Sequence, residues 1–541
     1  MLDKTLLRAE IDATLKLTAS TDAFVTEARA HGLLFLVDVR PGQAIGDVAR
    51  VFAAIDARFE AAPLFPSPPF DPPAPDAAPT WRDCAFVARL RSVAFGDISI
   101  NSWDIAHAAR LDGGFEDVRP DILIPAEVPP QPADTKDHTP GWERKVMRIE
   151  DAWKAFDREN RQPGKDIFIG HPDSGWYPHR CWDKGGLDIA RAYNFLEDQP
   201  AGNARDRLDG PQPGHGCATA SVMVAPIGYP VEGIAPFAKV LPIRCLKTVA
   251  QPTEYWMTRA LRYATEKKCQ IISNSWGGVW GLEQGIHRAI SDAVDANIIV
   301  VAAAGQYIPF RITAEPANYA HVIGAAGIEQ DGKTYKPWEQ SSRWPWRSIA
   351  ISAPACQVNR AFADPNNGNR YELSEGTSYA TAFTAGIAAL WLSFHFPNGY
   401  SGSRKAQYRF KDHVQRTAET PSGFDDWFFG LIRADRLMNT AVPSDEAVEG
   451  EEKRDYCVFE RIAAMLNARD TDQIERLLAA ALDETDRGAL KGWAGEIVSI
   501  LRANPDLRVE IASRLATAPL SARALGGLLA PAASNALKAR F

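Results

Sequence analysis

Three short motifs supply a carboxylate, an imidazole and a hydroxyl. Asp173 lies in HPDSG, His215 lies in GHG, and Ser378 lies in GTSYA. A serine hydroxyl is a poor nucleophile at neutral pH, so it needs a base to take its proton. The base in turn needs a carboxylate that fixes its tautomer and stabilises the imidazolium. These residue types predict covalent catalysis with Ser378 as nucleophile, His215 as base and Asp173 as orienting carboxylate.

Each residue also has a simpler explanation. An aspartate before serine and glycine often forms a turn, and a histidine or serine at a helix start often caps it. Here Asp173 follows the apolar segment 166–170, while His215 and Ser378 each open an apolar helical segment. Sites in open α/β sheets form outside the carboxyl ends of strands, where helix N-termini face them. We therefore expect the three side chains to converge on one crevice.

The surrounding segments alternate between strand and helix patterns. Short apolar runs separated by helical segments of 10–15 residues predict parallel βαβ units with both sheet faces covered. The expected strands are 166–170, 239–246, 270–276, 298–305, 321–327 and 348–354, and one clear intervening helix is 282–297. The predicted fold class is α/β, a doubly wound parallel sheet.

Composition divides the chain into five parts. The first, 1–127, mixes strand and helix patterns and predicts a small α/β domain. A linker rich in proline and charge follows at 128–140. The catalytic domain spans 141–445, an acidic linker spans 446–456, and 457–541 has purely helical periodicity. We expect the last part to be a small helical bundle.

Smaller elements are also predicted in the two flanking parts. The first part should contain helices at 22–30, 44–59 and 102–111 and strands at 33–39 and 84–93. In the last part, Asp470 is expected to cap a helix, and Pro505 is expected to begin another.

The order of the three candidate residues separates known catalytic arrangements. α/β-Hydrolases run serine, acid, histidine with a G-x-S-x-G motif, and trypsin-like enzymes run histidine, aspartate, serine. The order here is aspartate, histidine, serine, which is that of subtilisin. The sequence resembles the subtilisin-like serine proteases (peptidase family S8, the subtilases) over about residues 141–441. Five blocks in family order carry the resemblance: 142–153, 232–246, 273–278, 300–306 and 376–391.

The resemblance implies a serine endopeptidase that hydrolyses peptide bonds through an acyl-enzyme. It places Gln306 where the family has its oxyanion asparagine, and it implies that Ser275, Trp276, Gly277 and Gly305 line the substrate groove. Glutamine carries the same amide donor on a stem one methylene longer. Because an oxyanion donor is typically worth about 10²–10³ in turnover, this departure keeps an alternative open: a catalytically weak or dead subtilase scaffold that binds extended peptides.

Other features of the site remain open in the sequence. Glu315 lies near the family's primary specificity pocket, where it could favour basic substrates, but we favour a surface carboxylate. No cofactor is expected to be required. The resemblance leaves structural calcium open, although no acidic cluster has the spacing of a calcium loop. An esterase or amidase acting on small molecules is a third reading of the same triad.

The flanking parts suggest regulation. The segment 115–125 resembles the end of a subtilase prodomain, so 1–127 is either a cleaved chaperone and inhibitor or a retained regulatory domain. The helical bundle is either a stabilising cap or an interaction module for an adaptor or for self-association. We expect a zymogen-like, latent enzyme with protein or peptide substrates.

Composition restricts the setting. The 541 residues have a net charge of −8, 45% hydrophobic residues and 24% charged residues, which is ordinary for a globular protein. The mild acidity gives no reason to expect nucleic-acid binding, and no apolar run is long enough to span a membrane. The acidic N-terminal residues do not resemble an export signal, and seven scattered cysteines suit a reducing compartment. A cytoplasmic location is therefore predicted.

Overall fold

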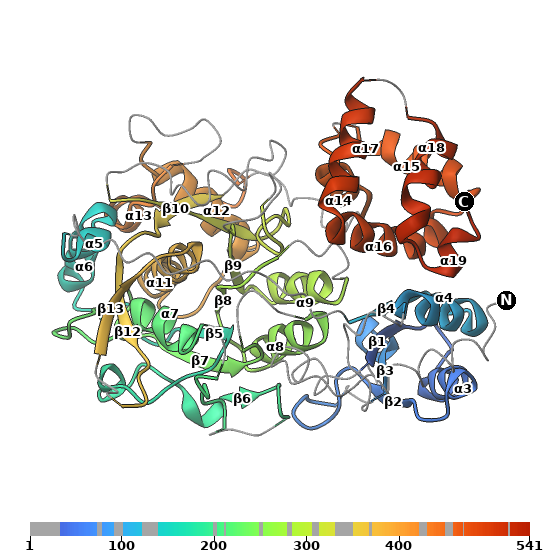
Figure 1. Cartoon of the computed structure of the whole chain (residues 1–541). Helices are drawn as coiled ribbons and strands as arrows, with labels where there is room; N and C mark the ends of the chain where they lie inside the picture. Colours follow the sequence, from blue (N-terminus) through green and yellow to red (C-terminus); the bar gives the residue numbers. More distant parts are fainter. Residues whose placement is uncertain are drawn as a thin grey trace.

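The computed structural model has three packed units, shown in Figure 1. We call them the N-terminal unit (33–121), the central unit (139–448) and the C-terminal bundle (458–541). The structure describes residues 33–72, 78–90, 101–121, 139–198, 203–209, 212–247, 253–278, 284–305, 313–330, 350–366, 370–420, 430–448, 458–468, 470–517 and 520–541. The helix predicted at 22–30 lies outside these residues. The domain boundaries drawn from composition stay a prediction.

The central unit is built on a seven-stranded sheet in which every pairing is parallel, in the order β11-β10-β9-β8-β5-β7-β6. Its strands are β5 (Phe168–Asp173), β6 (Tyr193–Asn194), β7 (Lys239–Arg244), β8 (Ile271–Asn274), β9 (Ile299–Ala303), β10 (Ile323–Ile328) and β11 (Ile351–Pro354). The predicted α/β fold class is confirmed, and all six predicted strands are present.

Adjacent residues along these strands enter opposite cores. Ile271 belongs to the apolar cluster that contains helices α7 (His215–Val224) and α11 (Thr377–His395). Its neighbour Ile272 belongs to the cluster with α8 (Glu254–Glu266) and α9 (Gln284–Asp295). Successive strand side chains point to opposite faces, so an unbroken apolar run is what a sheet covered on both sides requires. Further helices complete the unit: α5 (Trp142–Met147), α6 (Ile149–Arg158), α12 (Ala406–Thr417) and α13 (Ala434–Asn439).

Two features of the central unit were not predicted. The strand β6 has only two residues, too few to show a period. The strands β12 (Val358–Phe362) and β13 (Arg370–Ser374) form an antiparallel pair outside the main sheet. Their sequences, VNRAF and RYELS, mix charged and apolar residues, because the pair is buried less completely than the central strands.

The N-terminal unit is a four-stranded antiparallel sheet in the order β2-β3-β1-β4, packed on two helices. The elements are β1 (Leu33–Asp38), α3 (Ile45–Ile55), β2 (Glu60–Pro63), β3 (Ala85–Leu90), α4 (Ser102–Gly113) and β4 (Asp117–Pro120). It has its own apolar core, centred on Phe35 and Phe52. The predicted small α/β unit is confirmed.

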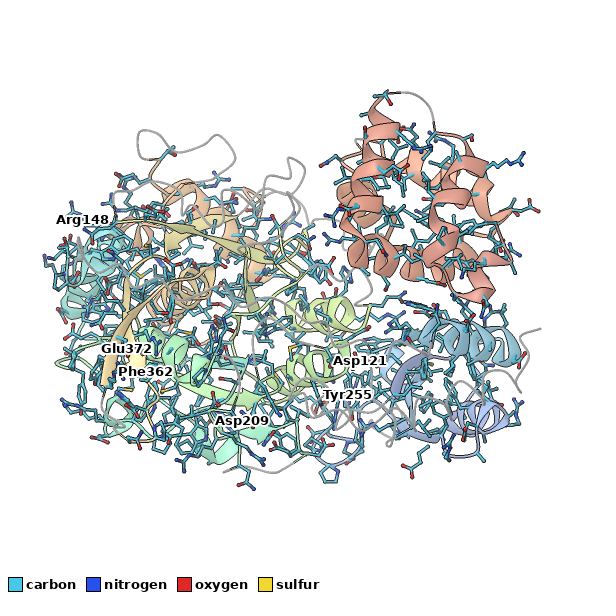
Figure 2. The ribbon with its side chains drawn as sticks, in the orientation of Figure 1. Asp121, Arg148, Asp209, Tyr255, Phe362 and Glu372 are labelled. Atoms are coloured by element: carbon cyan, nitrogen blue, oxygen red, sulfur yellow. The ribbon has the colours of Figure 1, made fainter. Side chains whose placement is uncertain are left out.

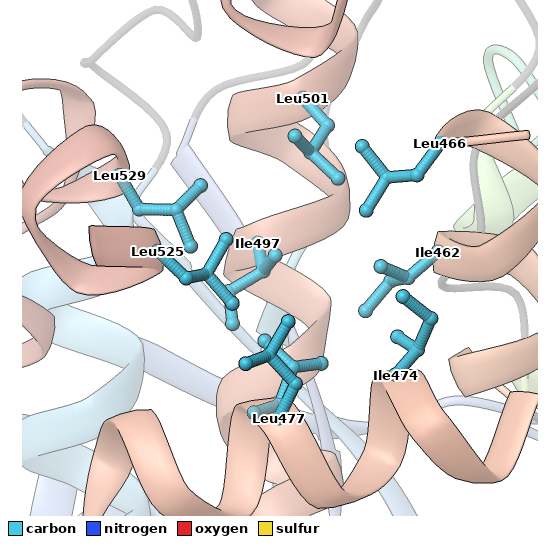
Figure 3. Close-up of a pocket in the computed structure, with 9 residues that line it drawn as sticks. Ile462, Leu466, Ile474, Leu477, Ile497, Leu501, Leu525 and Leu529 are labelled. Atoms are coloured by element: carbon cyan, nitrogen blue, oxygen red, sulfur yellow. The ribbon is translucent and has the colours of Figure 1, made fainter. Parts of the chain in front are cut away.

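The C-terminal bundle is all helical, as predicted. Its helices are α14 (Val458–Met465), α15 (Thr471–Leu482), α16 (Arg487–Ala503), α17 (Pro505–Thr517), α18 (Ala522–Leu529) and α19 (Asn535–Lys538). Asp470 caps α15 by accepting a hydrogen bond from the Gln473 amide at 3.0 Å. Nine aliphatic side chains enclose an apolar pocket between the helices (Figure 3): Ile462, Leu466, Ile474, Leu477, Leu478, Ile497, Leu501, Leu525 and Leu529.

The N-terminal unit docks on the N-terminal ends of α8 and α9. Asp121 accepts a hydrogen bond from the Tyr255 amide at 3.2 Å, where α8 begins; Figure 2 labels both residues. Arg119 donates to both carboxylate oxygens of Glu254, at 2.8 and 2.6 Å. The Gly285 amide at the start of α9 donates to the same Glu254 carboxylate at 2.7 Å. Carboxylates are favoured at helix N-termini, where backbone amides are unpaired and the dipole is positive.

The ion pair in this interface is buried. Burial by itself lowers the pKa of Arg119, but the negative charges of Glu254, Asp38 and Asp117 outweigh it and hold the pKa well above its usual value. Arg119 also donates to Asp38 at 2.8 Å and to Asp117 at 2.9 Å. Removing one member of such a group leaves uncompensated buried charge.

The C-terminal bundle contacts both other units. The buried side chains of His107 in α4 and Glu496 in α16 are hydrogen-bonded at 2.8 Å. Asp104 in α4 accepts hydrogen bonds from the Asn535 and Ala536 amides, at 3.2 and 2.9 Å, and so caps α19. The bundle therefore packs over α4 through hydrogen bonds between buried polar side chains and through capping of α19. No described helix is long and apolar enough to cross a lipid bilayer.

A core truncation tests the packing of the bundle. Leu482 is fully buried and Val509, in the same bundle, is 63% exposed. We expect Leu482→Ala to cost about 2–5 kcal/mol and to raise hydrogen exchange throughout 458–541. The matched Val509→Ala should leave exchange unchanged. Equal effects of the two substitutions would contradict the assigned core.

Candidate active site

Asp173 ends β5, an interior strand of the sheet, and has no exposed surface. Its carboxylate accepts a hydrogen bond from the Ser174 amide at 2.6 Å. Burial by itself raises the pKa of Asp173, but the charge of His215 and the hydrogen bonds from His215 and Ser174 outweigh it, so the pKa is lowered. The carboxylate is therefore ionised at neutral pH although it is buried.

His215 begins α7, and its side chain is oriented by that carboxylate. The Nδ1 atom lies 2.9 and 3.0 Å from the two carboxylate oxygens of Asp173. A carboxylate can only accept, so Nδ1 carries the proton and Nε2 of the neutral ring is left as the basic atom. This is the arrangement expected for a general base.

The glycines around these residues permit the close approach. A Cβ atom on Gly216 would lie 2.3 Å from the Gly175 carbonyl oxygen, and one on Gly175 would lie 2.2 Å from the Ala204 oxygen. Gly175 also has a φ of +106°, and Gly214, which precedes α7, has a φ of +71°. The glycines of DSG and GHG are therefore required for His215 to reach the end of β5.

A polar network behind the pair was not predicted from the sequence. Ser174 Oγ accepts a hydrogen bond from the Gly216 amide at 2.9 Å. Asp206 accepts one from the Gly214 amide at 2.9 Å, so the residues on both sides of His215 are held. Arg244, fully buried and in register with Asp173, donates to the Ser174 carbonyl at 2.6 Å and lies 3.6 Å from Asp206. The sequence signal was limited to an arginine at the end of the largely apolar strand β7.

A second histidine lies beside the pair. His171 is buried on β5, and its Nε2 lies 2.8 Å from Thr219 Oγ1 and 3.7 Å from an Asp173 oxygen. Thr219 donates in turn to the His215 carbonyl at 2.9 Å. Burial lowers the pKa of His171, despite the nearby Asp173 charge, so His171 is neutral at pH 7. The Asp173 carboxylate therefore interacts chiefly with His215. The sequence assigned His171 a structural or surface role, and its burial agrees with the structural one.

Ser378 is the second residue of α11, which packs against α7 (Figure 1). Its hydroxyl donates to the Ser275 carbonyl at 3.0 Å, and the Ser275 hydroxyl donates to the Ser378 carbonyl at 3.0 Å. Within the described residues, the His215 side chain is hydrogen-bonded to Asp173 and not to Ser378. The structure thus joins Asp173 to His215 directly and joins Ser378 to the segment after β8.

The remaining predicted residues, three of the groove and the oxyanion residue, fall into three groups. The Trp276 side chain is 1% exposed and packs in the apolar cluster of α8 and α9, so only its backbone is available to a groove. Gly277 and Gly305 follow β8 and β9, and Gly305 has a φ of +90°. Gln306 lies outside the described residues.

The expectation that Glu315 is a surface carboxylate is wrong. Its side chain is 1% exposed, because Arg461 from α14 covers it and forms an ion pair with it. No sequence pattern could have indicated this contact, since the two residues are 146 positions apart in the numbering. Within the described ranges, no group of three or more histidine, cysteine or acidic residues could hold a metal ion.

Comparison with known proteins agrees with this geometry. A family model described as "Subtilase family" matches residues 164–449, more than half of the chain. Fervidolysin of Fervidobacterium pennivorans is 25% identical over 47% of this chain and 38% of its own. The thermostable alkaline protease of Halalkalibacterium halodurans is 30% identical over 46% and 63%. Thermitase of Thermoactinomyces vulgaris is 28% identical over 41% and 73%. The matches therefore span less than two thirds of the first two relatives.

The fold has also been solved in a relative. The crystal structure of fervidolysin, described as a keratinolytic enzyme related to subtilisin, superposes with a TM-score of 0.53 at 19% identity. The superposition covers 76% of this chain and 61% of that one, so the likeness in fold extends beyond the residues of the family match. The chain belongs to the subtilase family of serine proteases.

Proposed function

We propose that the protein is a serine endopeptidase that cleaves peptide bonds through an acyl-enzyme, with Ser378 as nucleophile, His215 as general base and Asp173 as orienting carboxylate. The observation that carries the proposal is the hydrogen bond from His215 Nδ1 to the buried Asp173 carboxylate, at 2.9 Å. It leaves Nε2 as the basic atom of a residue that begins α7, the helix that packs against α11.

In the proposed reaction, Ser378 Oγ bonds to the substrate carbonyl carbon while its proton passes to His215 Nε2. The tetrahedral intermediate then collapses, the C–N bond breaks, and His215 returns the proton to the leaving amine. Water repeats the sequence on the acyl-enzyme and regenerates Ser378. The Ser378 amide, in the first turn of α11, is one available oxyanion donor, and Gln306 is the proposed second.

The hydroxyl of Ser378 must turn before it can react. In this structure it donates to the Ser275 carbonyl, at 3.0 Å, instead of to His215. The same contact favours the second candidate function, a scaffold that binds extended peptides without cleaving them. In either case the substrate is a protein or peptide lying along the segment Ser275–Gly277.

We further propose that the enzyme is latent and intracellular. Latency is supported by the charged interface at Glu254 and by the bundle that contacts the other two units. A reducing compartment is supported by buried free thiols such as Cys217, Cys245 and Cys269. Burial raises the pKa of Cys217 and of Cys269 to about 12, so these thiols are unreactive.

A fluorophosphonate probe distinguishes enzyme from scaffold. We expect Ser378 to be labelled, His215→Ala to slow labelling by about 10³-fold or more, and Asp173→Asn to do so by up to about 10⁴-fold, because the base or its tautomer is lost. His179→Ala serves as a control outside the proposed triad. Labelling that is absent under all conditions, or unaffected by His215→Ala, would favour the scaffold.

Substitution tests the proposed role of Gln306 as an oxyanion donor. If it donates to the oxyanion, Gln306→Ala should lower kcat about 10²–10³-fold with little change in KM. Gln306→Asn should retain or raise kcat. Steady-state peptide hydrolysis supplies both constants, and equal kcat for wild type and Gln306→Ala would remove Gln306 from the mechanism.

If the enzyme is latent, weakening the contact between the N-terminal unit and the central unit should raise its peptidase activity. Removal of one partner from a buried ion pair typically costs about 3–5 kcal/mol. Arg119→Met should therefore detach the unit and raise peptide hydrolysis roughly tenfold or more. Arg50→Ala is the control, because that side chain is 69% exposed in the same unit. Unchanged hydrolysis in Arg119→Met would contradict an inhibitory role for this unit.

A further inference from the structure

Glu315 lies beside the segment that leads to the nucleophile. The Glu315 amide donates to the Gly278 carbonyl at 2.8 Å, and the Gly278 amide donates to the Glu315 carbonyl at 3.1 Å. Three residues earlier, Ser275 exchanges hydrogen bonds with Ser378. The Glu315 backbone is therefore paired with the segment that follows β8, the same segment in which Ser275 is hydrogen-bonded to Ser378.

Several central-unit residues beside the Glu315 backbone are small and uncharged. The Ala314 amide donates to the Ala304 carbonyl at 2.8 Å. A Cβ atom on Gly277 would lie 2.9 Å from the Glu315 oxygen and 3.0 Å from the Ala314 methyl. We call Gly277, Ala303, Ala304, Ala314 and Glu315 the Glu315 site. Of these five residues only Glu315 is charged, so a cation is the group that the site is suited to hold.

The Glu315 site already holds such a group. The guanidinium of Arg461 forms an ion pair with the carboxylate, and the two side chains are 10% and 1% exposed. Arg461 comes from the C-terminal bundle, not from the central unit. A carboxylate buried this completely is stable only with a partner, and here the partner belongs to a separate packed unit.

Arg461 lies on a helix that is packed into the core of the bundle. The next residue, Ile462, and Leu466, which directly follows α14, line the apolar pocket of the bundle (Figure 3). Phe459 is also fully buried in that core. One face of α14 is therefore fixed in the bundle while Arg461 reaches the central unit.

We propose that the Glu315 site is a subsite for an arginine or lysine side chain of the substrate, and that Arg461 occupies it in place of substrate. The C-terminal bundle is then a built-in competitive inhibitor whose displacement opens the subsite. The inference rests on the proposed function, because it assigns the substrate class of that same site. Charge-assisted hydrogen bonds to a desolvated carboxylate favour arginine over an uncharged group of the same shape.

The test measures peptide binding in the full chain carrying Ser378→Ala, so that it needs no turnover. The probes are pairs of fluorescent hexapeptides that differ only in arginine or citrulline, placed at each position in turn. With Arg461→Met, which removes the charge but keeps an unbranched side chain, arginine should bind about tenfold or more tightly than citrulline in one register. Adding Glu315→Gln should return the ratio to about one.

Three control chains isolate the role of Arg461. Chains with Arg461 intact, with Arg461→Lys, or with Arg476→Ala in the exposed face of α15 should bind both peptides weakly. If Arg461→Met does not fold, Glu315→Gln alone still tests the latch: it should raise hydrogen exchange in α14, and Arg461→Lys should not. Equal affinities for arginine and citrulline peptides in Arg461→Met, or an arginine preference that survives Glu315→Gln, would overturn the proposal.

Fluorophosphonate labelling of Ser378 separates this inference from the proposed function. Labelling without arginine discrimination removes the subsite and leaves the endopeptidase. Arginine discrimination without labelling leaves the subsite on a chain that does not catalyse.

Discussion

The charge of Asp173 is buried at the carboxyl end of β5, and the surrounding structure compensates for it. The Ser174 amide and His215 bond to the carboxylate directly. His171 stays neutral beside it, because burial lowers its pKa. An isolated buried carboxylate would take up a proton, and a protonated Asp173 could no longer fix the tautomer of His215. The sheet, the glycine turns and the start of α7 all serve to keep this one group ionised.

Helix N-termini are used twice in this fold, in different ways. In the central sheet, α7 and α11 bring His215 and Ser378 to the edge where the strands end. On the opposite face, Asp121 of the N-terminal unit accepts from an amide at the start of α8. Glu254, the first residue of α8, pairs with Arg119 of that unit and also accepts from the amide at the start of α9. The proposed chemistry thus lies at one pair of helix ends, and the intramolecular docking lies at another.

Much of this was readable from the sequence, for physical reasons that also set the limit. Unbroken apolar runs such as 298–305 predicted buried parallel strands because both faces of the sheet are covered. The glycines of DSG and GHG marked Asp173 and His215 because only glycine permits their backbones to meet. The proposed triad follows from motif order, whereas the hydroxyl orientation of Ser378 depends on its neighbour Ser275.

What the sequence did not reveal depends on contacts between distant segments. Arg244 and Asp206 carry no local pattern that indicates their network around His215. The pairs His107–Glu496 and Arg461–Glu315 each join residues that lie more than a hundred positions apart in the sequence. In the sequence alone, each partner resembles an ordinary polar surface residue. Tertiary packing, not local periodicity, makes these groups buried.

The account rests on the tautomer that Asp173 imposes on His215, and nitrogen NMR of the histidine-labelled full chain measures it directly. At pH 8, with His215→Gln used to assign the signal among the ten histidines, we predict a protonated Nδ1 and an unprotonated Nε2 for His215. In Asp173→Asn the proton should move to Nε2. A protonated Nε2 in the wild-type chain, or a tautomer that Asp173→Asn leaves unchanged, would contradict the account.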